Sequence, residues 1–228
     1  DNTQDADMNF SVATGALTVE DGSMLLLYDN GAVTATNFTP GGTVTTDPSA
    51  DGTDSVVDGD VTIQSGATLT MGANALSVGG DFTNAGTFSE SGSPHVTTFT
   101  ATATGHTIDS GTGNLDNVTF NGTGGGWSLS DASNTIAGDL TMTAGTLSGT
   151  TSLTVNGGDV TGDGTINLTG GTFLLDAAGN FGGATGWTFS SLTFGDGTGV
   201  ATSTATGSGG ITASGVLTIA ANQTLNAG

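Results

Sequence analysis

Residues 59–71 read GDVTIQSGATLTM and contain two short segments in which every second side chain is apolar. Val61 and Ile63 share one side of the first segment, and Leu69 and Met71 share one side of the second. A period of two is typical of a strand with one buried face. The Ser-Gly pair between the segments supplies the backbone conformations that a tight corner requires. The sequence therefore predicts short strands joined by sharp corners.

The same alternation recurs in residues 139–143, 152–156 and 215–219, and no stretch has a convincing helical period. Glycine supplies 41 of the 228 residues and threonine is abundant. Both residue types disfavour helix interiors. High glycine with only 9% charged residues also fits a disordered chain, but the ordered alternation opposes that interpretation. We therefore expect an all-β fold.

Internal repeats indicate how the strands are arranged. GDVTI at residues 59–63 returns as GDLTM at 138–142, and residues 76–83 return with one insertion at 153–161. The chain thus holds imperfect copies of a unit of roughly 75 residues, each with several strands and corners. This predicts a parallel β-solenoid, in which each turn of chain pairs with the turn below. The alternative is a β-sandwich, but aromatic residues are only 6% of the chain, which is a poor supply for a sandwich core.

Three regions are expected from the distribution of these signals. Residues 1–46 form an N-terminal strand region that provides either the first coils or a contact between subunits. Residues 47–58 form an acidic loop, and residues 59–228 form the solenoid repeats.

Several repeats resemble a known kind of protein. Residues 80–88, 97–101, 116–120 and 138–141 are similar to the tandem repeats of large secreted bacterial surface proteins, in the style of adhesin and autotransporter passenger domains. The resemblance covers most of residues 59–228 and, more loosely, residues 9–46. It implies a right-handed parallel β-helix located outside the cell or on its surface. The complete loss of lysine and arginine is a departure that this resemblance does not require.

The charge balance restricts the partners. The chain has no lysine or arginine and 21 acidic residues, which gives a formal net charge of −21. Nucleic acids and anionic membranes both bind through basic side chains, so neither is an expected partner. The longest apolar run, Met24 to Tyr28, is too short to insert across a bilayer. Cysteine is absent, so neither disulfides nor thiolate metal sites contribute to the fold.

The sequence contains no catalytic motif, so we expect that the protein is not an enzyme and that it binds no cofactor. The chain has no arginine or lysine that could bind the carboxylate of a uronate. No nucleophile motif accompanies His95 or His106, and we expect these two histidines at the surface or at corners. A carbohydrate-active β-helix built on clustered aspartates is a minor alternative. Trp127 and Trp187 follow glycines at similar repeat positions and are expected to anchor the interior.

Calcium is the one ion to consider. Five carboxylates lie within fourteen residues, and no EF-hand or glycine-rich calcium motif accompanies them, so they predict loose calcium binding or a solvated loop. These candidates are Asp47, Asp51, Asp54, Asp58 and Asp60. Glycans are a further candidate partner, because sequons occur at Asn9, Asn37, Asn117, Asn121, Asn167 and Asn222.

Threonine pairs that flank one apolar residue suggest a minor alternative function. On a strand both hydroxyls of such a pair point the same way, and stacked threonine arrays on solenoids are one means of binding ice. The spacing along the chain is too irregular to promise one aligned face. The pairs are Thr43 with Thr45, Thr68 with Thr70, Thr102 with Thr104, Thr141 with Thr143, and Thr204 with Thr206.

The leading prediction is a structural subunit of an extracellular filament or surface layer. Solenoid ends leave unpaired strands, which favour contact with another copy. The residues expected to mediate self-association, through the ends or by strand donation, are Leu25, Leu26, Leu27, Tyr28, Leu217 and Ile219. Residues 25–28 are apolar on both faces, which suits a strand covered on both sides. The alternative is a stalk or adhesin segment of a longer surface protein.

Overall fold

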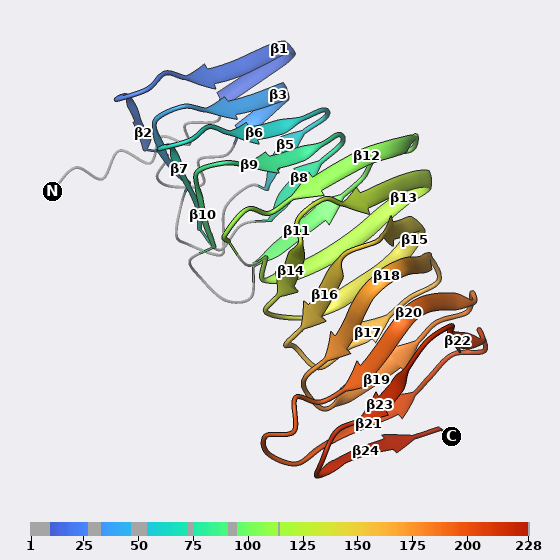
Figure 1. The fold of residues 1–228 in the computed structure, drawn as a ribbon. Helices are drawn as coiled ribbons and strands as arrows, with labels where there is room; N and C mark the ends of the chain where they lie inside the picture. Colours follow the sequence, from blue (N-terminus) through green and yellow to red (C-terminus); the bar gives the residue numbers. More distant parts are fainter. Residues whose placement is uncertain are drawn as a thin grey trace, which may run out of the picture. The chain divides into compact units, whose positions relative to one another are not determined.

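The computed structural model describes residues 10–26, 33–46, 54–72, 75–90, 95–113 and 115–227. The chain divides into unit 1 (residues 1–98 and 110–113) and unit 2 (residues 99–109 and 114–228), which are considered separately below. Both consist of strands and turns, and the described residues contain no helix (Figure 1). In consequence, no helix in the described part of the chain is long and apolar enough to cross a membrane.

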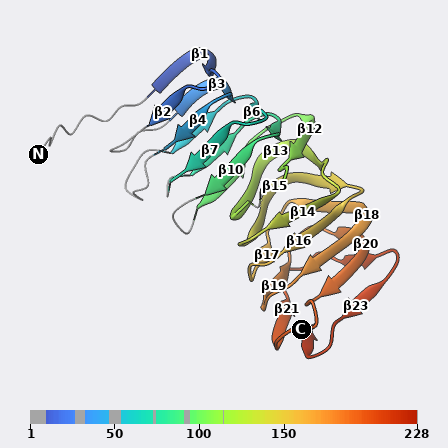
Figure 2. The ribbon, with the colours of Figure 1, turned by 60° about the vertical axis from the view of Figure 1, so that its left-hand side comes forward.

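Unit 1 is a stack of coils whose strands pair in parallel. One series runs through β1, β3, β5 and β8, and a second runs through β3, β6 and β9 (Figure 1). A third runs through β2, β4, β7 and β10 (Figure 2). The strands are β1 (Phe10–Val19), β2 (Met24–Leu26), β3 (Val33–Pro40), β4 (Thr43–Thr45), β5 (Ser55–Val57), β6 (Val61–Ile63), β7 (Thr68–Met71), β8 (Leu76–Val78), β9 (Phe82–Asn84) and β10 (Thr87–Glu90). The strand β11 (Val96–Phe99) follows at the boundary between the units in sequence.

Unit 2 repeats this arrangement with longer strands. Parallel pairs connect β13 to β15, β15 to β18 and β18 to β20, and the last coil pairs with β20 and β21. The strands are β12 (Thr104–Asp109), β13 (Asn117–Leu129), β14 (Ser133–Ile136), β15 (Leu140–Gly149), β16 (Ser152–Val155), β17 (Val160–Thr161), β18 (Thr165–Leu175), β19 (Gly179–Gly182), β20 (Trp187–Phe194), β21 (Ala201–Ala205), β22 (Ile211–Ala213), β23 (Leu217–Ile219) and β24 (Gln223–Asn226).

The predicted parallel β-solenoid is confirmed, and the alternative of a β-sandwich is wrong. A sandwich pairs neighbouring strands of the chain through antiparallel hairpins, whereas here a strand pairs in parallel with its equivalent in the next coil. Equivalent positions in adjacent coils are 19 to 25 residues apart, as the pairs Met24 with Thr43 and Thr43 with Thr68 show. Within the segment expected to be an acidic loop, residues 55–57 form β5, with Ser55 and Val57 buried.

Inward side chains of successive coils stack on one another to form each core. In unit 1, Phe38, Val61 and Phe82 form one such column, and all three are almost fully buried. In unit 2, Phe181 has its ring centroid 5.8 Å from Phe189 and 5.1 Å from that of Phe194. Complete burial of each such ring contributes about 1.5–3 kcal/mol, so a thin interior is sufficient to hold the coils together.

Trp127 and Trp187 are fully buried in unit 2, which confirms that they anchor the interior. The indole Nε1 of Trp187 donates a hydrogen bond to the carbonyl oxygen of Gly164 at 2.9 Å. The Trp127 ring packs 5.0 Å from that of Phe120. Neither indole is therefore available to stack on a sugar.

Candidate functional site

The strongest candidate site is the surface of the last coil in unit 2. The register aligns Leu217 with Leu192 and Ile219 with Phe194, so Leu217 and Ile219 occupy inward-facing positions. Their counterparts in the preceding coil are 2% exposed, yet Leu217 is 54% and Ile219 is 48% exposed. The apolar interior of unit 2 is thus uncovered at this coil, and we call its surface the C-terminal face.

An apolar cavity of about 190 Å³ opens at the C-terminal face. Its walls come from three successive parts of the last coil and from the coil beneath. The lining residues are Phe181, Leu192, Phe194, Ala205, Ile211, Ala213, Leu217, Leu225 and Ala227. No charged side chain contributes to it, so the cavity suits apolar side chains rather than a polar ligand.

The strands at the C-terminal face also have unpaired backbone edges. Among the described residues, β22 and β23 pair only with β20, and β24 pairs only with β21. On β22 and β23, an outer edge beside exposed apolar side chains is a template for another parallel strand. Leu217 and Ile219, both predicted to mediate self-association, belong to this template.

The N-terminal self-association candidates lie partly in unit 1. Leu25 is inward and half-buried on β2, in register with the buried Val44 of β4. Met24 and Leu26 point outward and are 68% and 40% exposed in the single chain, so the expectation that a neighbouring copy covers the outer face of this strand stays a prediction. Leu27 and Tyr28 lie outside the described residues. Within the described part of unit 1, β2 pairs only with β4.

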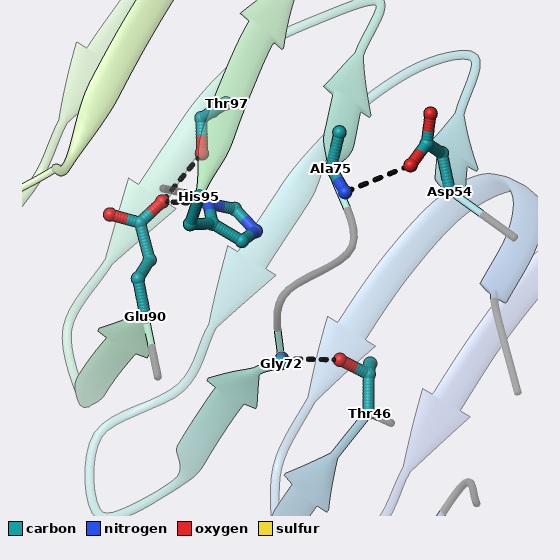
Figure 3. Close-up of polar contacts among 7 residues, drawn as sticks. All are labelled: Thr46, Asp54, Gly72, Ala75, Glu90, His95 and Thr97. Carbon is teal, nitrogen blue, oxygen red and sulfur yellow. Dashed lines mark hydrogen bonds and ion pairs between the residues drawn. The ribbon is translucent and has the colours of Figure 1, made fainter. Parts of the chain in front are cut away.

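The calcium candidates do not converge on a site in the described residues. Asp54 uses Oδ1 to accept a hydrogen bond from the backbone N–H of Ala75 at 2.9 Å (Figure 3). Asp60 accepts one from the N–H of Asp81 at 2.8 Å, and Asp58 is exposed. Asp47 and Asp51 lie outside the described residues. No group of three or more acidic or histidine side chains that could hold a metal occurs in the part of the chain that the structure describes.

A ladder of aspartate and asparagine side chains replaces the expected metal site. In each rung, Oδ1 of one residue accepts the backbone N–H of the equivalent residue in the next coil, at 2.8 to 2.9 Å. The rungs link Asn37 to Asp60 and Asp60 to Asp81 in unit 1, and Asn117 to Asp139, Asp139 to Asp159 and Asp159 to Asn180 in unit 2. We call this the Asx ladder.

The glycines before Asp60, Asp81 and Asp139 make room for the side chain that accepts the hydrogen bond of the rung. A Cβ at Gly59 would clash with Oδ1 of Asn37, and a Cβ at Gly138 would clash with Oδ1 of Asn117. The repeated Gly-Asp pairs were the signal that could have revealed the ladder. The partner of each aspartate lies one coil away, at a distance along the chain that a local pattern does not give.

Two histidines lie in different surroundings. His95 is fully buried in unit 1, so its expected surface position is wrong. Its Nδ1 is 2.6 Å from Oε1 of Glu90, whose side chain is only 3% exposed, and the Thr97 hydroxyl donates to the same oxygen at 2.9 Å (Figure 3). His106 is half-buried on β12, in register with Trp127. Neither histidine has a serine nucleophile among the contacts described here.

Comparison with known proteins adds no family. No family model, curated protein or solved structure matches the chain.

Proposed function

We propose that this protein is a structural subunit of an extracellular filament or surface layer, which self-associates through the ends of its solenoid. The C-terminal face carries this proposal, because it combines an uncovered apolar interior with unpaired strand edges. A second copy stacked there would bury Leu217 and Ile219 and would pair with the outer edges of β22 and β23. The resemblance to bacterial surface repeats and the absence of basic residues are consistent with an extracellular structural role.

Burial at the C-terminal face is large enough to favour such a contact. Each large apolar side chain removed from water contributes about 1.5–3 kcal/mol. Besides Leu217 and Ile219, the face offers Ile211 at 37% exposed and Val216 at 61% exposed. The net charge of −21 opposes association of copies at low ionic strength, so added salt should promote it.

Light scattering of the purified chain over a range of concentrations and salt tests this proposal. The wild-type chain should grow in size with both variables and should form polymers visible by electron microscopy. Leu217→Asp together with Ile219→Asp should leave monomers. Val200→Asp is the matched control, because Val200 is 86% exposed in the same unit and does not line the cavity. A wild-type chain that stays monomeric at every concentration and salt would contradict the proposal.

The second candidate is a stalk segment of a longer surface protein. The register of the last coil favours it, because Leu217, Thr218 and Ile219 align with Leu192, Thr193 and Phe194 without a shift. A further coil of the same polypeptide could continue that register. A stalk segment would remain monomeric in the light-scattering experiment, which separates the two candidates.

A further inference from the structure

Unit 1 carries a regular array of hydroxyl groups on its third series of strands. The register aligns Thr43 with Thr68 and Thr68 with Thr87, and it aligns Thr45 with Thr70 and Thr70 with Ser89. The pairs β4–β7 and β7–β10 show no register shift. The six side chains thus form two columns across three adjacent strands, seen side by side in Figure 2, and we call this array the threonine face.

The spacing of the threonine face follows from strand geometry. Adjacent strands lie about 4.8 Å apart, and alternate residues on one parallel strand lie about 6.6 Å apart. The hydroxyls and methyl groups therefore repeat in two dimensions on a grid close to that of oxygen atoms on a prism surface of ice. Irregular spacing along the chain does not disturb the grid, because the connections between strands absorb the differences in length.

A packed layer beneath the threonine face holds it rigid. Val44, Leu69 and Phe88 alternate with the hydroxyl residues, point inward and are at most 6% exposed. The outward side chains themselves are half-buried or exposed. Water molecules that are already ordered on a rigid array lose little further entropy when they join an ice crystal. The many weak contacts of such an array also add together.

The threonine face is also uncharged in a chain that has 21 acidic residues. The carboxylate next to it in sequence, Glu90, is turned inward to His95 and Thr97 and is 3% exposed. The next strand of the series, β2, extends the surface with Met24 and Leu26, both apolar. The six side chains of the grid therefore carry no ionic group of their own.

We propose that the threonine face binds ice. Its ligand is the crystal surface itself, held by hydroxyls and methyl groups that match the lattice repeat. This inference concerns unit 1 and does not depend on self-association through the C-terminal face.

Thermal hysteresis and partition of the purified full-length chain into a slowly growing ice front test the proposal. Wild-type protein should separate the melting and freezing points and enrich in the ice. Thr68→Tyr places a large ring in the centre of the grid and should reduce both effects several-fold. Thr68→Val should reduce them less, because the valine side chain has nearly the same shape as that of threonine. Thr62→Tyr is the matched control, since Thr62 is a half-buried, outward residue of β6 in the same unit but outside the grid.

Circular dichroism would verify that each variant is folded. Absence of hysteresis and of enrichment for folded wild-type protein would overturn the proposal, and so would equal losses in Thr68→Tyr and Thr62→Tyr. Wild-type binding to crystalline cellulose with no enrichment in ice would also overturn it, because the grid would then recognise a polysaccharide lattice.

Discussion

Oδ1 of Asp139 accepts a hydrogen bond from the backbone N–H of Asp159 at 2.9 Å. Two aspartates at equivalent positions of adjacent coils are thus directly linked. Asp159 in turn accepts the N–H of Asn180 at 2.8 Å. The ladder thus satisfies backbone donors at the coil corners while it holds like charges close together.

Removal of one rung should weaken unit 2. Asp139→Ala leaves the N–H of Asp159 without its acceptor and should lower the free energy of unfolding by about 1 kcal/mol. Asp139→Asn keeps an acceptor oxygen and removes one charge beside Asp159, so it should be at least as stable as wild type. Urea denaturation followed by circular dichroism measures both, and equal losses in the two variants would mean that charge, rather than the hydrogen bond, is the important property.

A methyl group at a ladder glycine should be costly. Gly138→Ala places Cβ against Oδ1 of Asn117 and should destabilise the protein by about 1–3 kcal/mol, as overpacking does. Gly210→Ala is the control, because no heavy atom lies within 4 Å of a Cβ at that position. The difference in melting temperature between the two variants is the measurement. Indistinguishable melting temperatures would show that the Asn117 side chain moves aside freely.

The buried carboxylate of Glu90 should stabilise unit 1. Glu90→Ala removes the acceptor for the Thr97 hydroxyl and the partner of His95 Nδ1 in a fully buried setting, and it should cost about 3 kcal/mol. Glu90→Gln preserves an oxygen at this place and should cost less. Guanidinium titration compares them, and a Glu90→Ala variant as stable as wild type would rule out a structural role for the pair.

Asp196 should titrate at lower pH than an ordinary aspartate. The Thr198 hydroxyl, and then the Thr198 N–H, donate hydrogen bonds to Oδ1 at 2.6 and 2.7 Å and lower the pKa of this exposed carboxyl. Because the folded pKa lies below the unfolded one, the associated stability is present above the unfolded pKa and is lost as pH falls through the folded value. Thr198→Val should raise the pKa of Asp196, and carbon NMR titration of the carboxyl group would measure the change. An unchanged titration would show that the hydroxyl contributes nothing.

Sequence alone predicted the strands and the direction of their side chains well. The alternation at residues 61–63 and 68–71 matches β6 and β7, and the predicted inward residues Val61, Ile63, Leu69 and Met71 are all fully buried. Period-two alternation is a local property that each strand carries by itself, which is why it can be read without knowing the partner strand.

Register could not be predicted in the same way. Thr45 and Thr70 align although the chain between neighbouring strands of this series varies in length, and the packed column of Val44, Leu69 and Phe88 fixes their relative positions together with the backbone hydrogen bonds between the strands. The burial of His95 was missed for a related reason. Glu90 lies five residues before His95 in the chain, and Thr97 lies two residues after it. These spacings do not indicate that the three side chains meet inside the core.

The stacking of coils in unit 2 has a consequence for proteolysis. Each coil of unit 2 is held mainly by the coil beside it, so a protease that removes β22 to β24 strips one layer and leaves the others paired. The layer then brought to the surface presents Trp187 in place of Ile211 and Phe194 in place of Ile219. A chain cleaved just before Ile211 therefore presents aromatic rings where it presented aliphatic side chains before.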